Sequence, residues 1–156
     1  MTQPTVSPAP ALGVEDGGGW IAARVGPGGF RADVTARTHH VVADEPATLG
    51  GTDLGPTPYE YLLGALAGCT AMTLRMYADR KSWPVTNIQV ELRTSRSHER
   101  DCEQCATEKV GVGRLDRRVV LEGPITADQR ERLLQIADRC PVKQTLEQGI
   151  QIRRVE

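Results

Sequence analysis

Four cysteines, Cys69, Cys102, Cys105 and Cys140, are the residues of this 156-residue chain whose chemistry is most distinctive. A thiol can attack as a thiolate, bind a soft metal ion or form a disulfide. The first residues, MTQPTVSPAPALGVEDGGG, lack the basic start and the apolar run of a signal peptide, so we expect a cytoplasmic protein whose cysteines are normally reduced. In that compartment cysteines serve catalysis, redox sensing or metal binding more often than structural cross-linking.

Cys69 and Cys140 have contrasting predicted surroundings. Cys69 lies in the middle of a predicted helix among small residues, where the ordinary role of a cysteine is that of a small buried hydrophobe. Cys140 precedes Pro141 and is the predicted N-cap of a short helix, where free amide protons and the helix dipole favour a thiolate. Arg139 adds positive charge beside it. An ordinary loop cysteine remains the alternative interpretation of Cys140.

Cys102 and Cys105 form a third feature, the motif DCEQC, with His98 four residues before the first thiol. This spacing resembles half of a zinc site, with one coordination position left open. A labile local disulfide and an inert, solvent-exposed pair are the two alternatives. The surrounding segment, residues 95–111, is polar and charged, and we expect it to form the tip of a long hairpin.

The stretch GPTPYEYLLGALAGCTAMTLRMYADRK, residues 55–81, positions Cys69. Thr57 can act as N-cap, Pro58 suits the first helical position, and no charge occurs from Tyr61 to Leu74. The pattern predicts a long helix that is apolar all round and is therefore wrapped by the rest of the protein. It is too short and too rich in Gly and Thr for a membrane span, so we expect no membrane association.

Period-two patterns and turn residues predict strands on both sides of this helix. The expected strands are 20–25, 30–36 and 39–43 before it, with 85–94, 113–122 and 150–155 after it. The expected fold class is α+β with antiparallel sheet. Residues 1–19 are expected to be a disordered tail, and residues 20–156 a single domain.

Two shorter helices are expected near the C-terminus. The first covers 127–138, begins with a capping box formed by Thr126 and Gln129, and turns Leu133, Leu134 and Ala137 to the core. The second covers 141–148 and is capped by Gly149.

The composition excludes some partners and suggests another. The net charge of −1 gives no reason to expect binding to nucleic acid or to an anionic membrane. Phe, Trp and Tyr make up only 4% of the chain, so the core relies on aliphatic side chains and would gain from burial against a second subunit.

The segments GPTPYEYLLGALAGCTAMTL and RCPVKQTL together resemble the OsmC/Ohr family of osmotically induced and organic-hydroperoxide-resistance proteins. The resemblance extends from Trp20 to the end of the sequence. The segments HHVVADEP, GGTDLGP, MYADRKSWP and DCEQC look like the divergent OsmC-like branch of the family.

The resemblance implies an OsmC-like fold, in which antiparallel sheets wrap a long central helix in an intertwined homodimer with active sites at the subunit interface. It also implies an organic hydroperoxide reductase, a two-cysteine thiol peroxidase with an antioxidant role in the stress response. Cys69 would be the peroxidatic cysteine and Cys140 the resolving one. The implied partners are an organic hydroperoxide and an external dithiol reductant, and the implied chemistry needs no metal or organic cofactor.

The family's peroxidases activate the helix thiolate with an arginine paired to a carboxylate. Their carboxylate lies ten residues before the cysteine, where this chain has Tyr59, and Glu60 follows at nine. Glu60 could therefore serve its own Cys69 only if the helix starts later, and otherwise would act across the dimer. Arg24, Arg31 and Arg37 are the candidate arginines. The alternative is an OsmC-like ligand-binding or redox-sensing module that lacks the activating pair, and a zinc-binding tip at Cys102, Cys105 and His98 is a weaker third possibility.

Overall fold

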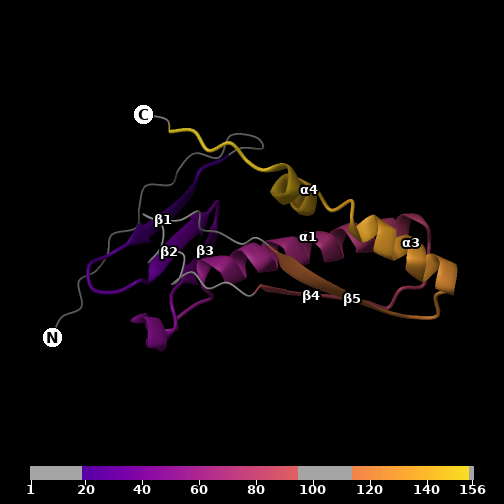
Figure 1. Ribbon diagram of the computed structural model, residues 1–156, viewed down its shortest axis with the longest axis horizontal. Helices are drawn as coiled ribbons and strands as arrows, with labels where there is room; N and C mark the ends of the chain where they lie inside the picture. Colours follow the sequence, from indigo (N-terminus) through magenta and orange to yellow (C-terminus); the bar gives the residue numbers. More distant parts are fainter. Residues whose placement is uncertain (1–18, 95–113, 155–156) are drawn as a thin grey trace. The chain divides into compact units, whose positions relative to one another are not determined.

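The computed structural model describes residues 19–94 and 114–154 of the chain (Figure 1). The chain forms two compact units, Met1–Pro58 and Tyr59–Glu156. The single domain expected for 20–156 stays a prediction. The expected tail, except Gly19, and the expected hairpin tip at 95–111 lie outside the described residues.

The first unit contains a three-stranded antiparallel sheet. Its strands are β1 (Ile21–Val25), β2 (Ala32–Ala36) and β3 (His39–Ala43), in the order β1-β2-β3. Ile21 lies opposite Ala36, and Ala36 lies opposite His39, so both connections are hairpins. The three strands predicted before the central helix are confirmed, with shorter bounds for the first two.

A loop after β3 is organised around Asp44, which is almost completely buried. Its carboxylate accepts hydrogen bonds from the hydroxyl of Thr52 at 2.6 Å and from the backbone N–H groups of Glu45, Thr52 and Leu54 at 2.8, 3.1 and 3.2 Å. A one-turn 3-10 helix, η1 (Ala47–Leu49), lies within this loop. The Thr52 hydroxyl is the main cause that holds the pKa of Asp44 below its ordinary value, although burial opposes it.

The second unit contains the remaining elements. The long helix α1 (Pro58–Arg80) begins at the boundary between the units, and the strands β4 (Asn87–Thr94) and β5 (Leu115–Glu122) pair antiparallel. The helices α3 (Ala127–Ala137) and α4 (Pro141–Gln148) follow. Within the described residues, no helix is long and apolar enough to cross a membrane.

Local sequence signals set the ends of these helices. The capping box predicted at Thr126 and Gln129 is present at the start of α3. Gly149, with φ of 81°, is the C-cap of α4 as predicted. α1 ends in a Schellman arrangement, because the N–H groups of Ser82 and Trp83 bond to the carbonyls of Asp79 and Ala78 at 3.0 and 2.9 Å.

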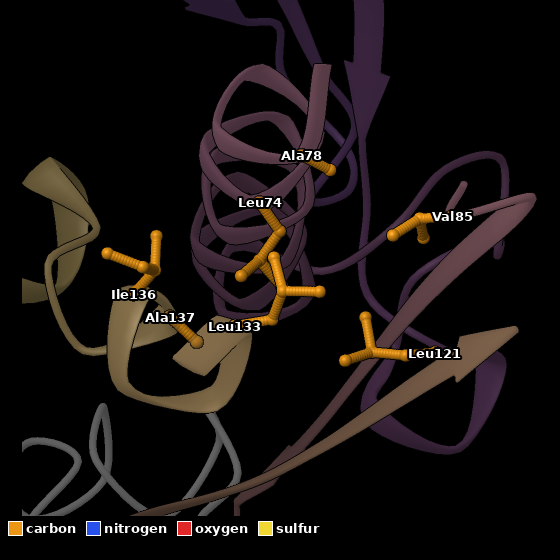
Figure 2. Close-up of a cluster of buried hydrophobic side chains, with 7 residues drawn as sticks. All are labelled: Leu74, Ala78, Val85, Leu121, Leu133, Ile136 and Ala137. Atoms are coloured by element: carbon orange, nitrogen blue, oxygen red, sulfur yellow. The ribbon is translucent and has the colours of Figure 1, made fainter. Parts of the chain in front are cut away.

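The core of the second unit joins α1 to α3 and to the β4–β5 hairpin (Figure 2). Its buried members are aliphatic: Leu74, Ala78, Val85, Leu121, Leu133, Ile136 and Ala137. Tyr77 and Trp83 pack against this cluster, and their rings meet edge to face at 5.6 Å. The expectation that α3 turns Leu134 to the core is wrong. Leu134 is exposed and Ile136 is buried, because the core stripe of α3 follows the spacing of 133, 136 and 137.

Within the described residues of this one chain, α1 is covered on one face. Its buried residues, Leu66, Thr70, Leu74 and Ala78, recur at every fourth position and therefore form one stripe. Met72 and Met76 are 69% and 64% exposed. The core of the second unit covers one face of α1, and an uncharged face remains open to solvent.

The strand expected at 150–155 is not formed in its described part, residues 150–154. Ile150 and Ile152 are exposed. A period-two pattern makes a strand only when a neighbouring strand supplies hydrogen-bond partners, and no described strand of this chain pairs with that segment. The α+β class with antiparallel sheets is confirmed.

Candidate functional site

Cys69 lies midway along α1, at the border between the buried and the exposed face of the helix. Thr70, the next residue, is fully buried. Met72 and Met76 follow Cys69 by three and seven residues and therefore share its exposed face. The half-buried Cys69 can thus contact the interior on one side and an approaching molecule on the other.

Cys140 lies at the junction between α3 and α4. The Cys140 N–H reaches the carbonyl of Ala137 at 3.4 Å, and the Cys140 carbonyl accepts from the N–H of Gln144 at 3.0 Å. Cys140 is the N-cap of α4, and Pro141 follows at the first helical position. Its side chain is fully buried. The position predicted for this cysteine is therefore confirmed.

The Cys140 thiol lies among several hydrogen-bond donors, and the Cys69 thiol is one of them. Burial would raise the pKa of the Cys140 thiol, but hydrogen bonds outweigh it and hold that pKa below its ordinary value of 9.0. The donors are, in order of effect, the Thr70 hydroxyl, the Lys143 N–H, the Cys69 thiol and the Val142 N–H. The side chain makes no regular capping bond, yet the amides of the first turn of α4 still face the sulfur.

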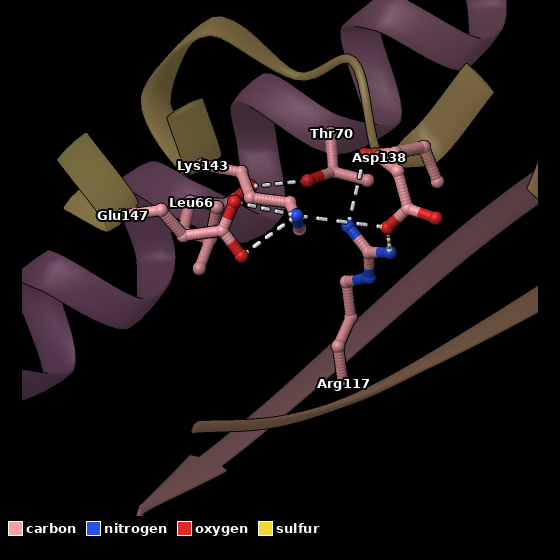
Figure 3. Close-up of polar contacts among 7 residues, drawn as sticks. Leu66, Thr70, Arg117, Asp138, Lys143 and Glu147 are labelled. Atoms are coloured by element: carbon pink, nitrogen blue, oxygen red, sulfur yellow. Dashed lines mark hydrogen bonds and ion pairs between the residues drawn. The ribbon is translucent and has the colours of Figure 1, made fainter. Parts of the chain in front are cut away.

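Thr70 links the Cys140 sulfur to the helix that carries Cys69. Its hydroxyl donates to the carbonyl of Leu66 at 2.8 Å (Figure 3). A hydroxyl has one proton, so it donates either to this carbonyl or to the Cys140 sulfur. The hydroxyl can therefore turn toward the sulfur when Cys140 is charged and back to the helix when it is neutral.

A chain of ion pairs lies beside the junction of α3 and α4 (Figure 3). Arg117 of β5 contacts Asp138 at 2.7 Å and donates to the carbonyl of Ala137 at 2.9 Å. Lys143 of α4 lies 3.9 Å from Asp138 and 2.7 Å from Glu147. These contacts connect the hairpin, the end of α3 and the first turns of α4.

The other predicted site residues lie on α1 and on the sheet of the first unit. Glu60 lies in the first turn of α1, so the helix does not start late enough to turn it toward its own Cys69. Nine residues correspond to 900° of rotation at 100° per residue, which is half a turn away. Arg31 pairs with Asp33 at 2.9 Å, and Arg24 lies opposite Asp33 in the sheet of the first unit. Their roles stay predictions.

The predicted metal ligands Cys102, Cys105 and His98 lie outside the described residues. Among residues 19–94 and 114–154, no group of three or more His, Cys, Asp or Glu side chains could hold a metal ion.

Sequence reasoning missed Thr70, Lys143 and Arg117. Thr70 lies four residues after Leu66 and four before Leu74, so the i, i+4 pattern could have placed it on the buried stripe of α1. The role of the Lys143 N–H as a donor could have been predicted, because Lys143 lies in the first turn of a helix capped by Cys140. Nothing local to Arg117 indicates its contact with the end of α3, which lies 20 residues further along the chain.

A comparison with models of protein families identifies the family of this chain. A family model described as OsmC-like protein matches residues 51–154 of the 156. The chain belongs to the OsmC family. The match includes both Cys69 and Cys140, and it confirms the resemblance that the two motifs indicated. A comparison with curated protein sequences finds no match.

Solved structures with the OsmC fold agree with this assignment. The chain is similar to an OsmC-like protein from Mycoplasma pneumoniae, with 19% identity, a TM-score of 0.68 and coverage of 85% of this chain and 89% of that one. An organic hydroperoxide resistance protein OsmC from Legionella pneumophila shows 19% identity, a TM-score of 0.56 and coverage of 80% and 85%. An organic hydroperoxide resistance protein from Elizabethkingia anophelis shows 16% identity and a TM-score of 0.59, with coverage of 80% of this chain and 86% of that one. These likenesses concern the fold.

Proposed function

We propose that this OsmC family protein is a thiol peroxidase that reduces organic hydroperoxides through Cys69 and Cys140. The observation that carries the proposal is the place of the Cys69 thiol among the hydrogen-bond donors around Cys140, which together hold the pKa of the Cys140 thiol below its ordinary value. The names of the Legionella and Elizabethkingia proteins, both organic hydroperoxide resistance proteins, support the substrate class. We expect the reaction to take place in the cytoplasm, with an external dithiol as reductant.

The hydrogen bond between the sulfurs suggests how the first step proceeds. Cys69 attacks the outer oxygen of the hydroperoxide while its proton passes to the Cys140 thiolate. The O–O bond breaks, the alkoxide takes this proton and leaves as an alcohol, and Cys69 becomes a sulfenic acid. The hydroperoxide has then gained the two electrons that Cys69 has lost, and Cys140 is a thiolate again.

The second step forms a disulfide between the two cysteines. The Cys140 thiolate attacks the sulfur of the Cys69 sulfenic acid, the S–O bond breaks, and hydroxide leaves and takes a proton to become water. A disulfide between Cys69 and Cys140 remains. An external dithiol restores both thiols by exchange and is itself oxidised by two electrons. No metal or organic cofactor enters this cycle.

The exposed face of α1 supports a homodimer as the active form. Met72 and Met76 are more than half exposed and lie on the same face as Cys69. An apolar surface of this kind gains free energy when a second subunit covers it. A partner seated there would close over Cys69 and exclude water from the site. It could also supply Glu60, together with Arg24 or Arg31, as the carboxylate and the cation that assist Cys69.

The test is catalytic turnover with an alkyl hydroperoxide and a dithiol. The expected result is formation of one alcohol for each hydroperoxide consumed, with oxidation of one dithiol. The Cys102→Ser/Cys105→Ser double variant should retain this activity and serves as the matched control for the two other thiols. Wild-type protein that leaves the hydroperoxide unchanged would refute the proposal.

A second function, a redox-sensing module of the same fold, is favoured by the placement of Glu60 half a turn away from Cys69 on its own helix. Such a module would form the Cys69–Cys140 disulfide stoichiometrically with an oxidant and would not turn over with a dithiol. Turnover kinetics with excess hydroperoxide and dithiol separate the two functions. A peroxidase gives repeated cycles at a constant rate, whereas a sensor gives a single slow oxidation.

A further inference from the structure

We infer that Arg117 is a positioning residue, which holds the Cys140 sulfur in place against Cys69. This inference rests on the proposed use of the two cysteines as a redox pair. The side chain of Arg117 is only 19% exposed, in contrast to the 82%, 84% and 76% of the neighbouring arginines Arg93, Arg114 and Arg118. A guanidinium this enclosed has a fixed direction, and it points at the residues just before Cys140 (Figure 3).

The carbonyl of Ala137 is the first link between Arg117 and the cysteine. This oxygen accepts the Arg117 N–H at 2.9 Å and also the backbone N–H of Cys140 at 3.4 Å. Ala137 is the last residue of α3, where carbonyl groups lack partners within the helix and attract a positive charge. Arg117 therefore fixes the oxygen that anchors the backbone of Cys140.

Asp138 is the second link, and it leads into α4. Its carboxylate contacts Arg117 at 2.7 Å and lies 3.9 Å from the ammonium group of Lys143, which in turn contacts Glu147 at 2.7 Å. The backbone N–H of Lys143 is one of the donors that face the Cys140 sulfur. Asp138 thus ties the guanidinium of β5 to the turn of helix that stabilises the thiolate.

The two links act on the same quantity, the position of one sulfur between two helices. Disulfide closure depends steeply on such placement, because a shift of about 1 Å can reduce the rate of a positioned reaction by about a hundredfold. Neither link touches the reacting atoms. Arg117 accordingly acts through Ala137 and Asp138 and has no direct part in the chemistry.

Arg118 is a matched control. It is the next residue of β5, it carries the same charge, and it contacts Glu91 at 3.1 Å. Successive residues of a strand point to opposite faces, so Arg118 does not share the contacts of Arg117 at α3. The variants Arg117→Gln and Arg118→Gln remove the same charge and one ion pair each, at positions one residue apart.

The experiment measures closure of the Cys69–Cys140 disulfide by diamide, an azo compound that takes two electrons and two protons from a dithiol. Arg117→Gln should slow closure about tenfold or more, and Arg118→Gln should leave it within about twofold. Arg117→Lys should recover part of the rate, since one ammonium group cannot keep both contacts. Equal rates for Arg117→Gln and Arg118→Gln would overturn the inference.

Two further measurements separate positioning from folding. The rate of Cys140 alkylation against pH, in a Cys69→Ser background, should shift to higher pH in Arg117→Gln and stay in place in Arg118→Gln. If Arg117→Gln does not fold, Asp138→Asn is the second variant, because it removes the contact of Asp138 with Arg117 while the Ala137 contact remains. Asp138→Asn should slow disulfide closure severalfold. An unchanged rate in that variant would refute the inference. Wild-type protein that closes with diamide but does not react with a hydroperoxide would refute the proposed function and leave the role of Arg117 intact.

Discussion

Asp44 in the first unit and Cys140 in the second are two buried side chains that this protein stabilises in the same way. Each lies beside the hydroxyl of a threonine, Thr52 or Thr70, and beside backbone N–H groups. In both cases these donors favour the charged form, so the pKa of the Asp44 carboxyl and that of the Cys140 thiol lie below their ordinary values despite burial.

The difference lies in where the donors come from and what else they can do. The donors to Asp44 all lie within the ten residues that follow it, and none of them can be oxidised under ordinary conditions. Two donors to Cys140, Thr70 and Cys69, come from α1, and Cys69 is itself a thiol. The same electrostatic arrangement therefore shapes a loop at Asp44, but it prepares a redox reaction at Cys140.

The largest expected effect follows from removal of the donor that can react. Cys69→Ser keeps a hydroxyl beside Cys140 but should abolish reduction of an alkyl hydroperoxide. Cys140→Ser removes both the proton acceptor of the first step and the second thiol, so it should slow oxidation of Cys69 and leave the sulfenic acid that forms there without a thiol to attack it. Dimedone labelling followed by peptide mass spectrometry detects this product. A Cys69→Ser variant with wild-type turnover would show that Cys69 is not the residue that reduces the hydroperoxide.

A smaller effect is expected when a threonine loses its hydroxyl. Thr70→Val keeps the shape of the side chain but removes a hydrogen bond worth about 1 kcal/mol, so alkylation of Cys140 at pH 7 should slow by roughly three- to tenfold. The cause is a higher pKa of the Cys140 thiol. Peptide-resolved alkylation with iodoacetamide between pH 5 and 9 measures it.

Thr52→Val is the matched control for this substitution, because it removes the corresponding hydroxyl beside Asp44. It should leave the alkylation profile of Cys140 unchanged. Identical profiles for Thr70→Val and the wild type would mean that the hydroxyl stays on the carbonyl of Leu66 and does not stabilise the sulfur.

The smallest effect on the thiols is expected from Asp44→Asn, which should change stability alone. The folded-state pKa of Asp44 lies below the ordinary 3.8, so its carboxylate stabilises the fold above about pH 4, and this contribution is lost as the pH falls through the folded-state pKa. The variant should thus be less stable than the wild type at pH 7 and lose less stability on acidification. Thermal unfolding at pH 7 and pH 3 measures both. Parallel losses in the two proteins would contradict the role given to Asp44.

Local patterns were sufficient to predict most elements of the fold. The capping box at Thr126, the Pro58 start of α1 and the Cys140–Pro141 start of α4 are signals read over a few residues, and all three are confirmed. The strand expected at 150–155 is not formed in residues 150–154, because the sequence pattern shows a suitable face but not a partner strand.

The site could be predicted only in part, for the same physical reason. The sequence indicated Cys140 as a helix N-cap, which depends on its immediate neighbours. The stabilisation of its sulfur by Thr70, and the contacts of Arg117 with Ala137 and Asp138, depend on residues brought together over long separations in the chain. Interactions of that kind follow from the packed structure and have no local pattern.

The most direct test of the account is a single-turnover reaction of the reduced protein with one equivalent of an alkyl hydroperoxide, followed by mapping of disulfide-linked peptides. The account predicts loss of two thiols, formation of one alcohol, and a cross-link between the peptides that contain Cys69 and Cys140. A cross-link confined to Cys102 and Cys105, or thiols that remain unchanged, would contradict it.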